Sequence, residues 1–480
     1  MANQYRGYQW FIIFVGLFFQ YGWSLIAQFT GFNERATGIL CIFLGTLLLF
    51  FFIDLMWPAV SCILSFAITD IYSFTDTLTY SFGHNIFWFV ILSGIVIGAI
   101  DKTGILRRIA IWMISRRFTR RSPWLFIGTL LFTVFVVGFF LDCTAATILF
   151  TAIMANILKE VDVQKGDRFG AIMMFSIMVI IGISFGGSAI GHSVAIATIG
   201  MFGHFGLNMG NFCLVGGLIG IICYIVYMIA LRFIFKLDVS KIKNYDPTML
   251  NVHKTPISKR EICAVSIYGI VILLWLSPAF TQSIWPEFYD FYNGLGQTVP
   301  LLLATVVMSL IRIDHEPLIN LDTDIRKNVP WSAGFLVAAA MILSTAMGDT
   351  EAGIPETIGS MLGPIFADVP ILLFVLGACF ISTTMTNYAG GMICMVTANS
   401  IVLTLMESGV ITNVSPGLAM LVSMCSAFAY ATPAAGTYSA IVAGQGWVSR
   451  KQLFLWGNGT AYLLMVILCT IGYQIANAVI

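Results

Sequence analysis

Residues Pro123–Leu158 read PWLFIGTLLFTVFVVGFFLDCTAATILFTAIMANIL, and the rest of the chain is interpreted from this stretch. It is apolar at both ends, but its centre carries Asp142, Cys143, Thr144 and Thr147. A helix that crosses a bilayer needs about 20 apolar residues, and this stretch is well past that length. Polar groups at membrane depth are tolerated only where protein or a water-filled cavity surrounds them. The pattern therefore predicts a re-entrant helical hairpin, 123–158, with a polar tip.

A second stretch, 369–406, has the same design. Its apolar ends enclose a polar centre that contains Thr383, Thr386, Asn387 and Tyr388. We interpret it as a second re-entrant hairpin. Two such hairpins predict that their polar tips meet at a binding site.

The composition excludes a soluble domain. The chain has 480 residues, of which 59% are hydrophobic and only 10% charged, and its mean hydropathy is +0.92. A net charge of +1 gives no indication of nucleic-acid binding. The ten cysteines show no zinc or disulfide spacing, and five histidines with scattered carboxylates form no catalytic set. We expect a membrane protein that is not an enzyme and needs no cofactor.

Hydropathy predicts an all-α integral membrane protein with about eleven transmembrane helices in addition to the two hairpins. Two of the spans are broken by glycine, proline or polar residues, at 170–204 and 416–446. The remaining spans are predicted as simple helices at Tyr8–Ile26, Ala36–Met56, Pro58–Ile71, Ile86–Ile100, Phe212–Phe235, Glu261–Pro278, Val299–Ile311, Trp331–Met347 and Leu453–Ile480.

A basic segment after the fourth span gives the orientation. Basic loops stay in the cytoplasm, so this segment is predicted to lie inside the cell. Its apolar residues alternate with the charges at roughly helical spacing, which favours an amphipathic helix along the inner membrane surface over a solvated loop. The basic residues are Lys102, Arg107, Arg108, Arg116, Arg117, Arg120 and Arg121.

Four landmarks recur at nearly one spacing: the hairpin tip, the proline before it (Pro123 and Pro370), a glycine in the broken span and the Ala-Ile pair after that glycine (195–196 and 440–441). Asp142 can be laid on Thr386, an offset of 386 − 142 = 244, and Gly191 on Gly436, an offset of 436 − 191 = 245. An odd number of crossings separates the copies, so the repeat is predicted to be inverted, as in secondary transporters with paired broken helices. We expect scaffold and transport domains in this order: scaffold helices 1–85, first repeat 86–235, linker and scaffold helices 236–330, second repeat 331–480.

Helix ends at the tips and breaks suit charged ligands. N-termini offer unpaired N–H groups to an anion, and freed carbonyls suit a cation. Asp142 is a functional candidate because a carboxylate in mid-membrane is costly; it could bind Na⁺ or carry a proton, and a structural role stays open. His192 could complete a proton relay with Asp142 or be a structural histidine. Thr432 and Pro433 break the second span, since proline removes a backbone donor.

The chain resembles the divalent anion/sodium symporters, which carry di- and tricarboxylates or sulfate. The resemblance rests on FWFVILSGIVIGAIDKTGILRRIAIWMISRR (87–117), NVPWSAGFLVAAAMILSTAM (328–347) and AFAYATPAAGTYSAIVAGQGWVSRKQLFLWG (427–457). In that family each hairpin tip carries Ser-Asn-Thr, where this chain has 142–144 (Asp-Cys-Thr) and 386–388 (Thr-Asn-Tyr). The family's Thr-Pro-Pro-Asn is Thr-Pro-Ala-Ala at 432–435.

The resemblance implies a homodimer that works by an elevator motion, with carboxylates and sodium held near the tips. At the first tip, Cys143 stands where the family has one of its two asparagines, and Asp142 stands where the family has a serine. Cys143 and Tyr388 could instead only shape the pocket. The expected substrate-binding residues are Cys143, Thr144, Ser188, Thr386, Asn387, Tyr388, Thr432 and Pro433. The expected metal ligands are Asp142, Gly187, Thr383, Asn387 and Ala431, and the expected proton-coupling residues are Asp142 and His192.

The leading hypothesis is a multi-pass plasma-membrane protein that moves small organic anions, of the di- or tricarboxylate class, by elevator-type alternating access coupled to Na⁺ or H⁺. Its expected partners are the anion, the lipid bilayer and a second copy of the chain, with no nucleic acid. A Na⁺/H⁺ antiporter and an uncoupled anion exchanger are the alternatives. A membrane-embedded enzyme fits less well because it needs a clustered acid, base or metal set, which the chain does not offer. A channel fits less well because it does not need an inverted repeat with two broken spans.

Overall fold

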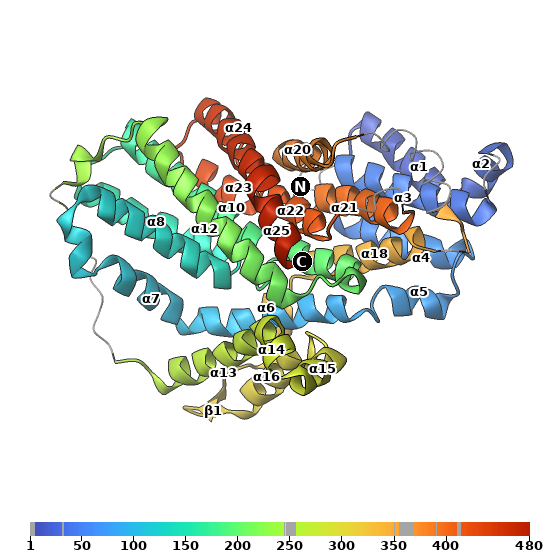
Figure 1. Ribbon diagram of the computed structural model, residues 1–480, viewed down its shortest axis with the longest axis horizontal. Coiled ribbons are helices and arrows are strands. Elements are labelled where there is room, and N and C mark those ends of the chain that lie inside the picture. Colours follow the sequence, from blue (N-terminus) through green and yellow to red (C-terminus); the bar gives the residue numbers. More distant parts are fainter. Residues whose placement is uncertain are drawn as a thin grey trace.

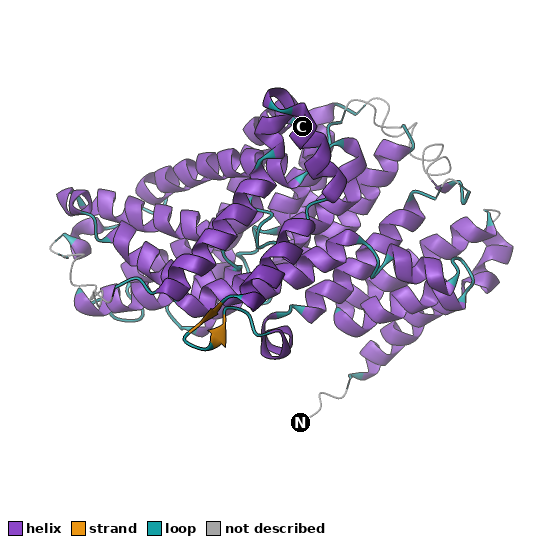
Figure 2. Ribbon diagram, turned by 90° about the horizontal axis from the view of Figure 1, so that it is seen from below, coloured by secondary structure: helices purple, strands orange, loops and turns teal. Residues whose placement is uncertain are grey.

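The computed structural model describes residues 5–30, 33–243, 245, 256–349, 351–354, 369–389, 391–409 and 414–480. Within these residues the chain is helical apart from one short antiparallel ladder, β1 (Arg312–Ile313) with β2 (Glu316–Pro317) (Figure 2). Eight of the described helices are long and apolar enough to cross a membrane, or up to eleven if each of three bent pairs is one span. The expectation of an all-α membrane protein is confirmed.

The N-terminal helices lie together at one end of the molecule, on the right in Figure 1. They are α1 (Gly7–Tyr21), α2 (Trp23–Thr30), α3 (Glu34–Phe52), α4 (Met56–Ile68) and α5 (Phe74–Tyr80).

The expectation of one unbroken span from Tyr8 to Ile26 is wrong. Gly22 separates α1 from α2, and the two helices meet at 70°. A side chain at Gly22 would begin only 2.8 Å from the ring of Phe18, so the tight turn there requires glycine.

The next helices carry the first predicted hairpin and the first break. Gly104, with a φ of 72°, ends the first of them in the left-handed conformation that glycine adopts readily. The elements are α6 (Asn85–Thr103), α7 (Ile105–Ile114), the 3₁₀ turn η1 (Arg117–Arg121), α8 (Pro123–Phe140), α9 (Cys143–Glu160), α10 (Arg168–Gly187), α11 (Ser193–Phe202), η2 (Gly203–Phe205) and α12 (Met209–Phe233).

The second half of the chain begins with the short η3 (Val239–Ile242) and a group of helices below the middle of Figure 1. This group is α13 (Lys259–Leu276), α14 (Pro278–Ile284), α15 (Pro286–Leu295) and α16 (Val299–Leu310). It is followed by α17 (Leu321–Asn328) and α18 (Trp331–Met347), and α18 lies on the right, beside α4. The C-terminal helices lie above the middle in the same view. They are α20 (Ile371–Ala389), α21 (Gly391–Glu407), α22 (Gly417–Ser426), α23 (Thr437–Gly444), α24 (Arg450–Ile467), the π-turn η5 (Leu468–Gly472) and α25 (Tyr473–Val479). Gly390, at the predicted second tip, lies outside the described residues.

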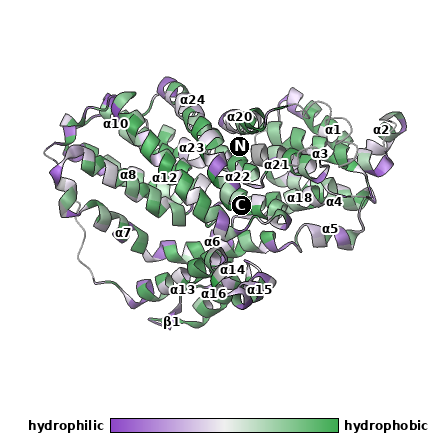
Figure 3. Cartoon of the chain, viewed as in Figure 1, coloured by the Kyte–Doolittle hydropathy of each residue, from purple (hydrophilic) through white to green (hydrophobic). Residues whose placement is uncertain are grey.

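Charged residues gather at helix ends and connecting segments, while the helix bodies are apolar (Figure 3). Several pair with partners far away in the sequence and so join distant helix ends. The described pairs are Arg35 with Asp349 and Glu351, Lys102 with Asp324, Arg108 with Glu261, His204 with Glu407, and Lys241 with Asp167.

Helices α10 and α12 approach each other through glycine. A Cβ built at Gly187 would lie 2.5 Å from the backbone oxygen of Gly216, and the reverse contact is equally short. Such close backbone approach is typical of small residues at helix interfaces in membranes. This contact fixes the end of α10, where the first break begins.

Candidate functional site

We call residues 188–192, between α10 and α11, the first break, and residues 427–436, between α22 and α23, the second break. A central cavity of about 860 Å³ lies where the first hairpin tip meets both breaks. Its walls come from six places in the chain: Leu55 before α4, the C-terminal part of α6, residues 142–145, the first break with the ends of α10 and α11, the second break with α23, and the connection from α17 to α18. Elements from both halves of the sequence therefore build one open cavity.

Asp142 forms the first tip. Helix α8 ends at Phe140, and α9 begins at Cys143 with Asp142 as its N-cap. One carboxylate oxygen, Oδ1, accepts the backbone N–H groups of Thr144 and Ala145, at 2.8 and 3.3 Å. A carboxylate at this position satisfies amides that would otherwise lack partners and lies favourably at the positive end of the helix. The second oxygen, Oδ2, has no hydrogen-bond partner within the described part of the chain.

The first break is fastened to the hairpin. After α10 ends at Gly187, the hydroxyl of Ser188 donates to the carbonyl of Phe139 at 2.6 Å. His192 is the N-cap residue of α11, and its ring lies 3.8 Å from the ring of Phe185, centroid to centroid. The side chain of His192 is 2% exposed, and its Nδ1 has no hydrogen-bond partner among the described residues.

Thr437, the first residue of α23, joins the second break to the first tip. Its Oγ1 lies 3.4 Å from both the sulfur of Cys143 and the Oγ1 of Thr144. Thr437 was not among the site residues expected from the sequence. The repeat spacing could have found it, because 437 − 192 = 245 pairs it with His192, and each lies at the start of the helix after a break.

Three helix N-termini therefore converge on the cavity, those of α9, α11 and α23, at Cys143, Ser193 and Thr437. Each N-terminus carries partial positive charge and unpaired N–H groups. Among the described residues that line the cavity there is no Lys or Arg, and the acidic ones are Asp101 and Asp142. Asp101 was missed because the fourth span was predicted to end at Ile100, one residue before it. This arrangement can hold an anion on N–H groups and a cation on carboxylate oxygens.

The second hairpin is fastened to the second break by Asn387. Its amide donates to the carbonyls of Thr383 and Phe428, at 2.7 and 2.9 Å, and its oxygen accepts the N–H groups of Tyr430 and Ala431, both at 2.8 Å. These four bonds use both donors and both lone pairs of the amide. Asn387 therefore holds the broken backbone in shape.

The neighbours of Asn387 act in the same way. Thr386 donates to the carbonyl of Ser426 at 2.6 Å, and Thr432 donates to the carbonyl of Asn387 at 2.8 Å. Tyr388 is 52% exposed and donates to Oδ1 of Asn458 at 3.0 Å. The hydroxyl of Thr383 is buried without a partner within the described part of the chain.

The structure brings five of the expected site residues to the cavity and leaves the others away from it. Within the described residues, no group of three or more His, Cys, Asp or Glu side chains could hold a metal ion. The five at the cavity are Asp142, Cys143, Thr144, His192 and Pro433. The expected residues that do not line it are Gly187, Ser188, Thr383, Thr386, Asn387, Tyr388, Ala431 and Thr432.

Comparisons with known proteins agree with this architecture. A family model described as "Citrate transporter" matches residues 39–406, which is more than half of the chain. A "Sodium-dependent dicarboxylate transporter SdcS" of Staphylococcus saprophyticus is 23% identical over 428 residues, which are 84% of this chain and 79% of the relative. The protein of the same name from Staphylococcus aureus is 24% identical over 424 residues, with the same coverage.

These matches confirm the resemblance to the divalent anion/sodium symporters, and together with the apolar helices they confirm a multi-pass protein of the plasma membrane. They also confirm the expectation that the chain is not an enzyme. The chain belongs to the citrate transporter family.

Proposed function

We propose that this protein carries a small di- or tricarboxylate across the membrane in symport with Na⁺. The observation that carries the proposal is the convergence of three helix N-termini on a cavity whose described lining holds no Lys or Arg. N–H groups at helix ends would hold the carboxylates, as in transporters with discontinuous helices. The remaining negative charge, including that of Asp142, requires a co-bound cation. The names of the relatives, with dicarboxylate and sodium in them, favour the same pair.

The two helix pairs α8–α9 and α20–α21 act as re-entrant hairpins from opposite sides of the membrane. For the first pair, Trp124 at the start of α8 lies beside Arg232 at the end of α12. At the other end of α8, Tyr268, in the middle of α13, donates to the carbonyl of Phe140. These contacts favour one end at a membrane surface and the tip at mid-depth.

For the second pair, Glu407 at the end of α21 lies 3.6 Å from His204, beyond the end of α11. The other end of the pair, at Asn387, contacts the second break. In the predicted orientation His204 is extracellular, so this hairpin enters from the outside. The two hairpins and breaks are the halves of the inverted repeat, 86–235 and 331–480.

Transport proceeds by alternating access in which the hairpins and breaks move as a unit against the remaining helices. The cavity lies between the two groups, since Asp101 and Asn328 line it opposite the tip and the breaks. Both residues are at helix ends that the charge pattern predicts to be cytoplasmic. This conformation therefore corresponds to the inward-facing state of an elevator.

Counterflow in proteoliposomes tests the function. Labelled succinate, citrate, α-ketoglutarate and sulfate are each offered with Na⁺ and with choline, at acidic and neutral pH. We expect a carboxylate to exchange, with faster exchange in Na⁺. Exchange of a carboxylate that does not depend on Na⁺ or pH would favour the uncoupled exchanger. If none of the four anions exchanges, the carboxylate assignment is wrong and Na⁺/H⁺ exchange becomes the next assay.

A second coupling ion, H⁺, is favoured by one observation: His192 lines the cavity with Asp142, and its buried Nδ1 has no hydrogen-bond partner among the described residues. Asp142→Asn separates the two cases. Asparagine caps a helix as well as aspartate does, so the variant keeps its fold. If Asp142 binds Na⁺, the variant needs at least about tenfold more Na⁺ for half-maximal exchange, the factor for about 1.4 kcal/mol. If Asp142 carries a proton, the pH dependence is lost instead. A variant with unchanged Na⁺ and pH dependence would exclude Asp142 from coupling.

A further inference from the structure

A second cavity opens on the surface between α7, α8 and α12. It shares no lining residue with the central cavity. Its volume is about 690 Å³. The walls are apolar and mostly exposed: Trp112 is 60% exposed, and Leu125 and Phe132 are close to 40%. Tyr224 of α12 contributes to the floor. We call this cavity the α7–α8 groove.

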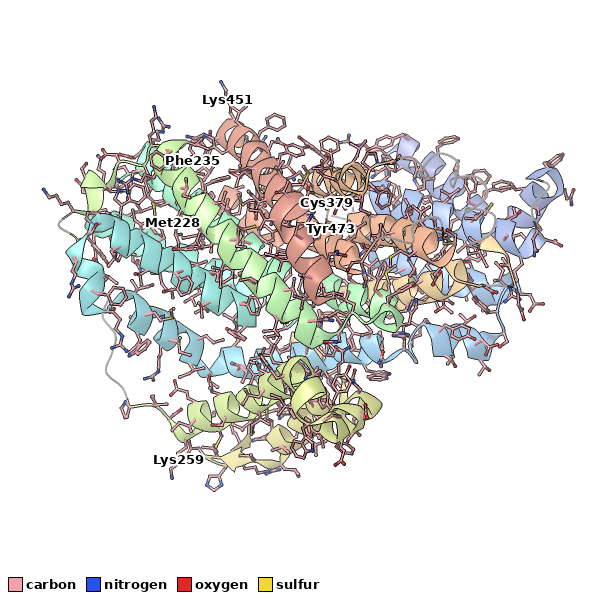
Figure 4. All side chains as sticks on the ribbon, viewed as in Figure 1. Met228, Phe235, Lys259, Cys379, Lys451 and Tyr473 are labelled. Atoms are coloured by element: carbon pink, nitrogen blue, oxygen red, sulfur yellow. The ribbon has the colours of Figure 1, made fainter. Side chains whose placement is uncertain are left out.

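The floor of the groove is closed by α12. The hydroxyl of Tyr224 donates to the carbonyl of Gly128 at 2.8 Å. Met228, labelled in Figure 4, also lies on α12, with its terminal carbon 3.7 Å from where a Cβ at Gly128 would be. From Leu125 to Phe132 the groove follows α8 for seven residues, which is about 10 Å at 1.5 Å per residue. The α7–α8 groove therefore runs along the first helix of the first hairpin.

Two arginine side chains lie at one end of the α7–α8 groove. The guanidinium carbon of Arg116 lies 3.4 Å from the centroid of the Trp112 ring, and that of Arg232 lies 5.7 Å from the centroid of the Trp124 ring. Both aromatic rings line the groove, and both arginines are exposed. Among the described residues, no carboxylate forms an ion pair with Arg116 or Arg232.

The surrounding sequence offers no acidic residue to balance these charges. Residues 102–121 contain Lys102 and six arginines but no Asp or Glu. Lys102 and Arg108 are paired with Asp324 and Glu261. The end of the groove is therefore strongly basic, whereas its length is apolar.

We propose that the α7–α8 groove binds one anionic phospholipid of the cytoplasmic leaflet. Arg116 and Arg232 contact the phosphate, Trp112 and Trp124 lie at the headgroup level, and an acyl chain follows α8 from Leu125 toward Phe132. Basic residues beside apolar surface attract anionic lipids of the inner leaflet, and tryptophan favours the membrane–water boundary. The proposal holds for any transported anion, because none of these residues lines the central cavity.

Native mass spectrometry of the full-length protein, titrated with phosphatidylglycerol or phosphatidylcholine, tests the proposal. We expect the wild-type protein to bind phosphatidylglycerol more tightly than phosphatidylcholine. The double variant Arg116→Gln/Arg232→Gln should bind phosphatidylglycerol about 25-fold more weakly, about fivefold for each arginine near an anionic headgroup. Its affinity for phosphatidylcholine should not change.

Two controls make the result specific. Lys451, an exposed cation in the first turn of α24 (Figure 4), is outside the groove, so Lys451→Gln should bind phosphatidylglycerol like the wild type. Arg116→Lys/Arg232→Lys keeps both charges and should retain most of the binding, which also shows that the sites tolerate substitution. Equal binding of the two lipids by the wild type would overturn the proposal, as would an equal loss in Lys451→Gln or undiminished phosphatidylglycerol binding by the glutamine double variant.

Discussion

Asn387 uses all four hydrogen-bonding positions of its amide inside the protein, on Thr383, Phe428, Tyr430 and Ala431. Asn387→Ala removes all four bonds. The carbonyl of Thr383 keeps its helical partner within α20, but three backbone groups of the second break, at Phe428, Tyr430 and Ala431, lose theirs, at about 1–3 kcal/mol each. We therefore expect the variant to lose at least about 3 kcal/mol of stability, measured as a large fall in Tm in detergent.

Tyr388→Phe is the matched control for Asn387→Ala. It removes one hydrogen bond of a half-exposed side chain at the next residue, so its free energy of unfolding should stay within about 1 kcal/mol of the wild type and its Tm should fall little. If Asn387→Ala keeps the wild-type Tm and loses only transport, Asn387 is a ligand and not the residue that positions the break.

His84 gives a pH dependence with a definite sign. Its Nδ1 accepts the N–H of Ile86 at the start of α6, and burial lowers the pKa of His84 below its ordinary value of about 6.5. The neutral form is favoured in the folded protein, so its stability is full above about pH 6.5 and falls as the pH drops through that value. Tm should therefore decrease from neutral to mildly acidic pH.

His84→Asn should weaken this acid dependence, because asparagine caps a helix without titrating. The difference between the Tm values at neutral and mildly acidic pH is the measurement, with His315→Asn, at an exposed turn, as the control variant. An acid-induced fall in Tm that is as large in His84→Asn as in the wild type would assign the effect to another group.

At the scale of elements, one ion pair fixes the basic helix α7 to α13. Arg108 lies 2.8 Å from the carboxylate of Glu261, which is only 4% exposed. Glu261→Gln removes the charge and weakens this hydrogen bond to a charged group, which contributes about 1.5–3 kcal/mol. We expect a lower Tm and faster proteolysis at the basic segment 102–121.

The exposed pair between Lys241 and Asp167 serves for comparison with Glu261→Gln. Both side chains are partly in solvent, so Asp167→Asn should change stability by less than about 1 kcal/mol. Equal effects of the two substitutions would show that burial of Glu261 contributes nothing to the link between α7 and α13.

The sequence predicted the positions of helices correctly where an apolar run is bounded by polar residues. The 17 residues of α18 have the predicted bounds, and the chain leaves the helix at Asp142, where the polar centre was predicted. The bend at Gly22 was missed because glycine within an apolar run is common and the contact of that residue with Phe18 is a tertiary property. Individual site residues were harder to predict. The repeat spacing could have pointed to Thr437, but the hydrogen bonds that hold Asn387 on the second break are tertiary contacts, which sequence spacing does not contain.

At the scale of the whole molecule, the position of the central cavity supports the proposal that the first tip moves relative to α6. Thr144, at the first tip, and Ile97, on α6, line the same cavity from its two sides. If the tip moves through the membrane while α6 stays, Thr144 changes the side from which it is accessible and Ile97 does not. Cysteines placed singly at these positions, in a variant without the ten native cysteines, report this through an impermeant maleimide.

We expect Thr144→Cys to react from the cytoplasmic side in inside-out vesicles and, in a second population, from the outside in intact cells. Substrate with Na⁺ should protect it by at least about tenfold in rate, because a bound anion at the α9 N-terminus covers the side chain. Ile97→Cys should react from the cytoplasmic side alone. Reaction of both positions from one side under every condition would contradict a moving tip, whereas reaction of both from both sides would indicate that α6 moves with it.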